Sequence, residues 1–331
     1  MSSDEALAGG LGISLFERLL RRGGAWAQFI SSFSYLRITD VPSIMLDTQY
    51  RMHPLISEFP CTEFYGATLR DGTVKAGVVL SQLKPPRSRL LDGKSTADGS
   101  HPAMLFIDHD NPEEKKDRSH LNHQESKIVA RIVEDLLLKN ADLKGKDIGV
   151  IAPYVAQIRL LEKTLRYDPH WTDHFIRALG EQRAREIRDV EVRTVDGFEG
   201  REKEVIIFST VRNNPYGEIG FLADRRRMNV ALTRAKRGLF VLGSIQTLGG
   251  SAQKMQSAKG DETGPTRRNR IGREAWNRYM QFVVKKGLFH ELGVPTVYRN
   301  PEELQMFFEA SKTSIGGYTF LSDTRMRSWR Q

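Results

Sequence analysis

The chain has 331 residues, enough for one large domain or two modest ones, and its apolar fraction of 39% is ordinary for a globular protein. The 50 Lys and Arg residues outnumber the 41 Asp and Glu residues, which gives a net charge of +9. This balance favours a polyanionic partner such as nucleic acid, although a generic basic surface has the same balance.

The single cysteine, Cys61, excludes an internal disulfide and any metal site made of several cysteines. It fits a reducing compartment, so we expect a cytoplasmic or nuclear protein. The eight histidines form no close cluster with it, and we predict no metal site of the chain's own. Apolar runs are all shorter than the roughly 18 residues that cross a bilayer, so we predict no membrane partner.

The N-terminal part of the chain mixes short elements with loops. Ser14–Arg22 carries a helical apolar stripe, and Ser43–Thr48 is typical of a short buried strand. A helix is expected from Pro54 onward. Residues 70–102 are rich in Gly, Pro, Ser and Lys, which indicates a loop.

From residue 103 onward, buried strands alternate with amphipathic helices. The predicted strands are Ala103–Asp108, Ile148–Pro153, Val192–Val195, Glu204–Thr210 and Gly238–Gly243. The predicted helices are Asn122–Leu138, Tyr154–Leu165, Arg226–Arg234 and Glu274–Lys285. Continuous apolar strands are typical of a parallel sheet covered on both faces. The sequence therefore predicts a three-layer α/β fold, followed by a flexible basic loop at Leu248–Arg273.

Two arginines are candidates for phosphate binding, because a planar guanidinium binds phosphate bidentately and keeps its charge. Arg234 ends a predicted helix just ahead of a buried strand, and Arg51 follows the strand Ser43–Thr48. We expect Arg51 at the carboxyl ends of the strands, where open α/β sheets bind ligands. The alternative for each is a surface arginine paired with a carboxylate. Tyr50 either stacks on a flat base or packs at a domain edge. His53 is expected to be structural, as a helix cap or a hydrogen-bond donor, rather than catalytic.

The loop Asp196–Glu202 joins two predicted strands. Its glycines, Gly197 and Gly200, permit tight turns and let backbone amides approach an anion. Glu202 could accept hydrogen bonds from a ribose, although a lone G-x-x-G also occurs in ordinary β-turns. At the strand end that we expect beside Arg51, the pair Pro153-Tyr154 either contacts nucleic acid or simply begins the next helix.

The chain contains no G-x-x-x-x-G-K-[ST] loop, and none of its buried strands ends in an acidic pair suited to Mg²⁺. Phosphoryl transfer requires such a loop, its lysine and the metal ion. We therefore expect that the chain by itself does not hold and polarise ATP.

Taken together, the motifs resemble the second RecA-like motor domain of superfamily 1 helicases, in the branch that includes the nonsense-mediated-decay helicase. The matching segments, in family order, are SLFERLL (14–20), LDTQYRMHPLISEFPCTEFYGATLRDG (46–72), DIGVIAPYVAQIRLL (147–161), VRTVDGFEGREKEVIIFSTVRNN (192–214), IGFLADRRRMNVALTRAKRGLFVLG (219–243) and AWNRYMQFVVKKGLF (275–289). The QYRMHP box with VALTRAK downstream is the most specific combination. One departure is Glu199, where the family often has glutamine.

The resemblance implies a role for each candidate residue. Arg51 and Arg234 correspond to the two arginines that reach the γ-phosphate of an ATP bound on the first motor lobe. The resemblance also implies that Tyr50 contacts the adenine and that Gly200 and Glu202 contact the nucleotide. The residues it places on the nucleic-acid track are Pro153, Tyr154, Thr194 and Asp196. Arg226 and Asn229 are expected to shape the cleft near Arg234.

The resemblance also implies a division of the chain. Residues 1–48 are expected to be a remnant of the first lobe's end with an atypical insert, and residues 49–247 the second RecA-like domain. Residues 248–273 form the flexible basic loop, and residues 274–331 a C-terminal helical segment and tail. ATP would then need the first lobe, which would also supply Mg²⁺. The expected partners are single-stranded RNA or DNA and a first lobe or helicase partner. The alternative is a non-catalytic nucleic-acid-binding or regulatory module.

Overall fold

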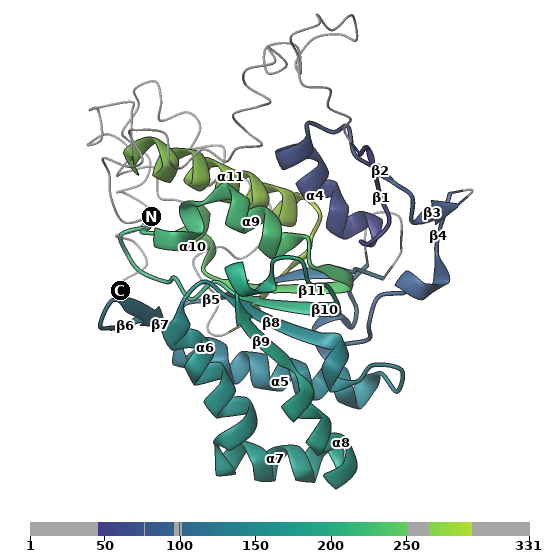
Figure 1. Cartoon of the computed structure of the whole chain (residues 1–331), viewed down its shortest axis with the longest axis vertical. Helices are drawn as coiled ribbons and strands as arrows, with labels where there is room; N and C mark the ends of the chain where they lie inside the picture. The colour runs from purple at the N-terminus through teal and green to yellow at the C-terminus, as the bar shows by residue number, and fades with distance from the viewer. Residues whose placement is uncertain (1–45, 76, 96–98, 100, 250–264, 293–331) are drawn as a thin grey trace, which may run out of the picture. The chain divides into compact units, whose positions relative to one another are not determined.

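The computed structural model describes residues 46–75, 77–95, 99, 101–249 and 265–292 (Figure 1). The described residues from Thr48 onward belong to one compact unit. The predicted helix Ser14–Arg22, most of the segment 1–48 and the tail beyond residue 292 lie outside the described residues.

The core of the fold is a parallel sheet with the strand order β12-β5-β11-β10-β8-β9. Its strands are β5 (Met104–His109), β8 (Ile148–Ala152), β9 (Glu191–Thr194), β10 (Lys203–Ser209), β11 (Ala235–Gly243) and β12 (Phe289–Leu292). Five of these strands lie where the sequence predicts them, and β12 was not predicted. The predicted α/β fold with a parallel sheet is confirmed.

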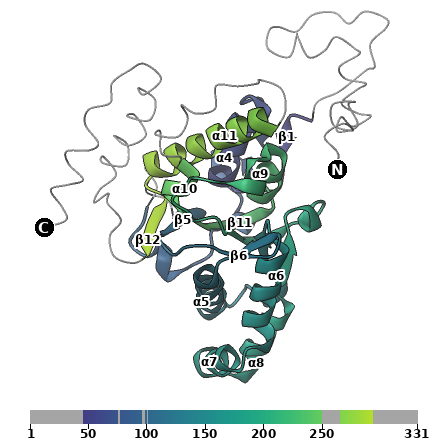
Figure 2. The ribbon, with the colours of Figure 1, turned by 90° about the vertical axis from the view of Figure 1, so that its left-hand side faces the viewer.

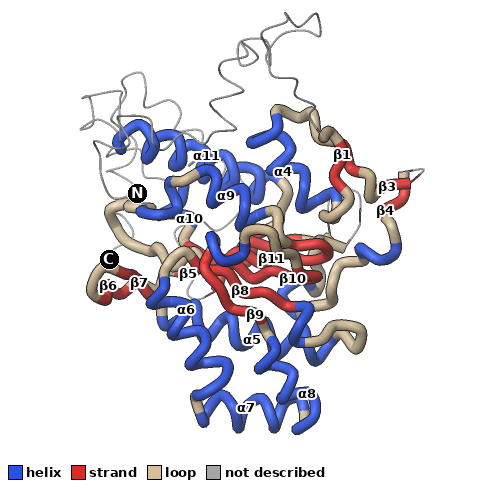
Figure 3. Tube along the Cα trace, viewed as in Figure 1, coloured by secondary structure: helices blue, strands red, loops and turns tan. Residues whose placement is uncertain are grey.

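Helices cover both faces of the sheet, which makes three layers (Figures 1 and 3). One face carries α4 (Pro54–Tyr65), α9 (Arg225–Leu232), α10 (Ile245–Gly249) and α11 (Pro265–Lys285). The other carries α5 (His123–Lys139), α6 (Val155–Glu162), α7 (Pro169–Leu179) and the adjoining α8 (Glu181–Arg185), as the turned view in Figure 2 shows. Side chains alternate along β11: Leu239 and Val241 join the first core, Phe240 and Leu242 the second.

Helix α11 begins at Pro265, so part of the segment predicted as the flexible basic loop is helical. The apolar face of α11 explains this, because it packs on the sheet rather than standing apart. The Trp276 ring lies 6.3 Å from that of Phe208 in β10, its indole N–H donates to the Leu222 carbonyl at 2.9 Å, and the ring of Tyr279 lies 4.9 Å from that of Phe59 in α4. The chain then returns through β12 to the edge of the sheet.

Several smaller elements escaped prediction. The hairpin β6 (Glu114–Lys116) and β7 (Ser119–Leu121) precedes α5, and a π-helical turn (Lys163–Tyr167) leads from α6 to α7. The described part of the loop 70–102 contains the two-residue strands β2 (Arg70–Asp71), β3 (Val74–Lys75) and β4 (Val78–Val79) among its turns. Strand β1 (Thr48–Gln49) pairs with β2. Short 3-10 turns occur at Ser81–Leu83, Arg89–Leu91, Gly145–Asp147, Glu186–Asp189, Asp196–Phe198 and Gly220–Ala223.

Candidate nucleotide and nucleic-acid sites

The predicted site residues gather at opposite ends of the parallel strands. Glu202 and Arg234 directly precede β10 and β11, so they lie at the amino edge of the sheet. Pro153 follows β8 and Thr194 ends β9, so they lie at the carboxyl edge. Two segments cross between these edges: residues 195–202 and helix α9.

Arg51 lies at the amino edge, and the expectation that it shares the carboxyl edge with Tyr154 is wrong. Its Nε donates to Glu202 Oε2 at 2.6 Å, and its Nη1 donates to the Thr233 carbonyl at 3.0 Å. The reason is that, among the described residues, β1 pairs with β2 and is not a strand of the main sheet. The rule for the carboxyl ends of the strands therefore does not apply to Arg51.

The QYRMHP box forms a tight turn that fixes Arg51. The Gln49 side chain oxygen accepts the backbone N–H groups of Arg51 and Met52 at 2.9 and 2.7 Å. Of the two structural roles expected for His53, its side chain takes the cap, since its Nδ1 accepts the Leu55 N–H at 3.1 Å. Its own backbone N–H donates to the Lys236 carbonyl at 2.8 Å, which ties the turn to β11.

Arg234 is held beside Arg51 by α9. Its Nε donates to the Val230 carbonyl at 3.1 Å, and its Nη2 donates to Thr233 Oγ1 at 3.0 Å. Burial, followed by the charge of Arg51, lowers the pKa of the Arg234 guanidinium. No carboxylate within 4.0 Å pairs with Arg234 among the residues described, so the alternative of an ordinary surface ion pair does not hold for it.

Glu202 links the cations of this edge. Besides Arg51, it contacts Lys236 Nζ at 3.1 Å. The Arg51 hydrogen bond is the largest reason why the pKa of Glu202 lies below its usual range. An open hollow of about 480 Å³ adjoins these side chains, and its lining includes Tyr50, Arg51, Glu202 and Lys236. Tyr50 is 75% exposed, so its ring is accessible to a ligand rather than packed away.

The other residues predicted near Arg234 lie on the same two segments. Gly200 has φ 77°, a left-handed conformation that favours glycine, and Arg234 Nη1 approaches the carbonyl of the next residue, Arg201, at 3.5 Å. Asn229 donates from Nδ2 to the Tyr65 hydroxyl at 3.1 Å. Arg226 is exposed and lies 3.7 Å from Asp224, with no contact to Arg234.

At the carboxyl edge, Tyr154 is only 3% exposed. Its hydroxyl accepts from Arg212 Nη1 at 3.2 Å, and Arg212 Nε donates to Glu113 at 2.9 Å. Tyr154 therefore cannot stack on a base in this conformation. Its ring instead lies 5.4 Å from that of Phe221, which is 52% exposed.

Phe221 belongs to a row of contacts that the sequence did not reveal. Arg227 holds the Asp196 carboxylate with two hydrogen bonds of 2.9 and 2.7 Å, and its guanidinium lies 5.4 Å from the centre of the Phe221 ring. Thr194 Oγ1 accepts the Gly197 N–H at 3.2 Å, which shapes the start of the crossing loop. An exposed ring beside a guanidinium can stack on an unpaired base, so Phe221 and Arg227 join the candidate nucleic-acid residues.

A buried carboxylate, that of Glu125, fixes the backbone at this edge through hydrogen bonds. Glu125, fully buried, accepts the Val211 N–H at 3.1 Å, the hydroxyl of Ser209, and a 3.0 Å hydrogen bond from His109 Nε2. Val211 has φ 71°, which is rare for a β-branched residue. Glu125 therefore holds a strained residue immediately before Arg212.

The amino edge has the chemistry to bind a polyphosphate. Three cations meet two carboxylates here, since Glu202 bridges Arg51 and Lys236 and Glu204 lies 3.5 Å from Lys236, while Arg234 has no carboxylate partner within 4.0 Å in the described part of the chain. Such excess positive charge fits phosphate oxygens. Across the described ranges, no group of three or more His, Cys, Asp or Glu side chains has metal-site geometry. In those same ranges, no helix is long and apolar enough to cross a membrane.

Comparison with known proteins matches this geometry to a family. A family profile described as an AAA domain matches residues 11–246. The chain belongs to that family. It is 36% identical over 245 residues to a regulator of nonsense transcripts 1 homolog of Neurospora crassa, covering 74% of this chain and 19% of that protein.

Two further relatives agree. The DNA polymerase alpha-associated DNA helicase A of Schizosaccharomyces pombe is 35% identical over 71% of this chain, and the helicase SEN1 of Saccharomyces cerevisiae is 36% identical over 62% of it. The alignments cover 31% and 8% of those two proteins, so this chain spans less than a third of each relative named here. The chain is a superfamily 1 helicase motor domain of the nonsense-mediated-decay helicase-like branch.

Proposed function

We propose that this chain is the second RecA-like half of an ATP-dependent superfamily 1 helicase motor that acts on single-stranded RNA or DNA. The convergence of Arg51 and Arg234 supports this most directly. Both donate hydrogen bonds to Thr233, one to its carbonyl and one to its hydroxyl. This arrangement aims two permanent cations at one place on the amino edge.

In this proposal, an ATP bound on a first lobe meets the amino edge of this chain. Arg51 and Arg234 would bind the γ-phosphate and stabilise the charge that develops on it in the transition state. Tyr50 would contact the adenine, and Glu202 the ribose. Gly200 would allow a backbone amide close to the phosphates. Mg²⁺ would be held by the first lobe.

The carboxyl edge would carry the nucleic acid. Pro153, Thr194 and Asp196 would contact or support the strand together with Phe221 and Arg227, while the buried Tyr154 would support the Phe221 ring. The loop 195–202 and helix α9 each run from this edge to the nucleotide edge. A shift of either segment would therefore alter both sites, so the bound nucleotide could change the affinity for the nucleic acid strand.

The chain alone, in this proposal, does not turn over ATP, because its sequence has no phosphate-binding loop. The second candidate is a regulatory module that binds nucleic acid or supplies its arginines to another motor. The exposure of Tyr50, at 75%, suits either arrangement, since both require a partner surface over the amino edge.

The deciding experiment measures ATPase activity of the purified chain with and without single-stranded RNA, beside an Arg234→Ala variant. We expect no turnover above background for either protein. RNA-stimulated turnover that disappears in the Arg234→Ala variant would overturn the proposal, since the chain would then contain a complete ATPase site. Binding of a fluorescent single-stranded RNA by the same preparation checks the carboxyl-edge assignment.

A further inference from the structure

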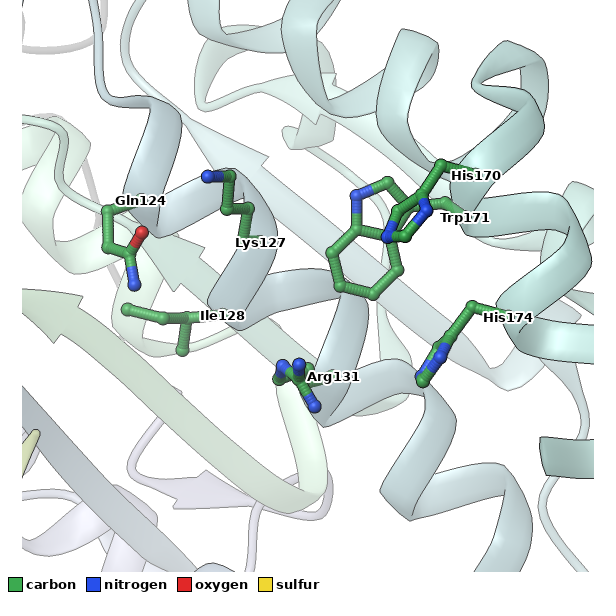
Figure 4. A pocket seen from close by; sticks show the side chains of 7 residues that line it. All are labelled: Gln124, Lys127, Ile128, Arg131, His170, Trp171 and His174. Carbon is green, nitrogen blue, oxygen red and sulfur yellow. The ribbon is translucent and has the colours of Figure 1, made fainter.

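A second hollow, of about 420 Å³, lies on the sheet face that carries α5, between that helix and α7. None of its lining residues belongs to either edge site described above. Its walls include Lys127, Arg131, His170, Trp171 and His174 (Figure 4). The hollow is within the volume range of small-ligand sites.

Two helices supply matched pairs of nitrogen-bearing side chains to this hollow. Lys127 and Arg131 are four residues apart on α5, and His170 and His174 are four residues apart on α7. That spacing puts each pair on one face of its helix. In Figure 4 the α5 pair and the α7 pair come from facing helices, with the indole of Trp171 beside them.

The positive charge here is not balanced by acids. Neither Lys127 nor Arg131 has a carboxylate within 4.0 Å in the described part of the chain. By contrast, the nearby Arg166 and Arg183 pair with Glu162 and Glu186 at 3.1 and 2.9 Å. A solvated helix face usually mixes both signs of charge, so two unpaired cations beside a hollow require a reason.

Glu134 of α5 pairs with a histidine of the hollow rather than with its cations. Glu134 lies 2.6 Å from His174 Nε2 and fixes the direction of that ring. An imidazole fixed in this way presents its remaining edge with little loss of side-chain entropy. The hollow therefore combines two free cations with one oriented ring.

The surroundings of Trp171 decide the shape of the ligand. Its side chain is only 9% exposed, with His174 edge-on at 5.5 Å, Phe175 tilted at 5.5 Å and Arg131 5.9 Å from the ring centre. No face of the indole is left for a stacked base. The two cations and the His170 imidazole instead suit a compact anion with several acceptor oxygens.

We propose that the α5–α7 hollow is a phosphate-binding site, with Lys127 and Arg131 as its charged ligands and His170 as a hydrogen-bonding partner, while His174, whose Nε2 donates to Glu134, forms part of the wall. The phosphate belongs either to a small free ligand or to the backbone of a bound nucleic acid strand. The site is independent of the ATP edge, so it stands whether or not the proposed motor function holds.

The first arm of the test titrates the intact chain with inorganic phosphate by calorimetry at low salt. We expect saturable binding in the millimolar range, and a Lys127→Ala/Arg131→Ala variant should lose the part that the hollow contributes while binding at the amino edge remains. The matched control is Arg185→Ala/Arg188→Ala, which removes the same charge from exposed positions outside the hollow and should leave binding intact. All four substituted side chains are exposed, so thermal unfolding should confirm that every variant folds.

The second arm measures single-stranded RNA affinity against salt concentration. If the strand's backbone fills the site, the Lys127→Ala/Arg131→Ala variant lowers the slope of log K against log salt by about 1.4, roughly 0.7 per lost phosphate contact. If the ligand is a free phosphate compound, the slope equals that of the control variant. The proposal is overturned if the intact chain shows no saturable phosphate binding, or if both double variants bind phosphate equally.

Discussion

The guanidinium of Arg51 is held by the carboxylate of Glu202, with 2.6 Å between Arg51 Nε and Glu202 Oε2. The two residues are far apart in sequence, and each has a predicted role at the same nucleotide. In this conformation Glu202, the proposed ribose contact, is paired with Arg51, the proposed phosphate contact. Binding of a nucleotide must therefore compete with this ion pair.

Glu202→Gln should separate the two roles. The substitution removes a negative charge beside Arg51 and Lys236, so pyrophosphate should bind about 3- to 10-fold more tightly, equivalent to about 1 kcal/mol of screened Coulomb energy. Adenosine, which carries no phosphate, should gain nothing. Calorimetry with both ligands checks this, with Glu181→Gln, on the exposed helix α8, as the control for lost charge. Equal tightening for adenosine would contradict the assignment.

The strands were predictable because a continuous apolar run is a local signal. The QYRMHP and VALTRAK boxes revealed the family because such residue combinations are rare. The meeting of Arg51 with Arg234 followed from family resemblance, not from spacing. The sheet edge of Arg51 was predicted wrongly, because a two-residue strand cannot be distinguished from a core strand by its apolar residues alone. Phe221 was missed, because a single aromatic residue in a loop shows no helical or strand periodicity that would mark it in the sequence.

Phe221→Ala should weaken binding of single-stranded RNA. Stacking of one base on an aromatic ring contributes about 1–3 kcal/mol, so the expected loss is about 5- to 150-fold. Fluorescence anisotropy with a short unpaired RNA measures it. Tyr167→Ala is the control, since Tyr167 is 73% exposed and follows α6, outside the row of contacts at the carboxyl edge. Equal losses in the two variants would argue against a stacking role for Phe221.

Glu63 joins three helices of one layer and should give the fold a pH-dependent stability. Its carboxylate, in α4, accepts from Arg225 of α9 at 2.8 Å and from Arg278 of α11 at 2.7 and 2.8 Å. Burial alone would raise its pKa, but the hydrogen bonds and charges of Arg278 and Arg225 outweigh burial and lower it. The stabilisation is therefore complete above the unfolded-state pKa and is lost as pH falls through the lower folded-state value.

Glu63→Gln should accordingly lower the free energy of unfolding by about 1–3 kcal/mol at pH 7, where two arginines lose their charged partner. The difference from the unaltered chain should shrink in acid, as pH falls through the lowered folded-state pKa of Glu63, because both proteins then carry an uncharged side chain at this position. Urea denaturation at the two pH values measures this. Glu58→Gln, which removes a surface pair with Lys286, should change stability by less than about 0.5 kcal/mol. A difference that persists unchanged in acid would exclude the charge as its cause.

Val211→Gly should be tolerated better than an equally buried Val→Gly change elsewhere. Val211 is fully buried, yet its φ of 71° is a conformation that glycine adopts without strain. Relief of about 1–3 kcal/mol of strain should offset most of the lost burial, so we expect a net cost below about 2 kcal/mol. Val150→Gly, in the centre of β8 and equally buried, should cost about 3–5 kcal/mol, since it has no such strain to relieve. Urea denaturation of both variants compares them, and equal costs would show that Glu125 holds Val211 without strain.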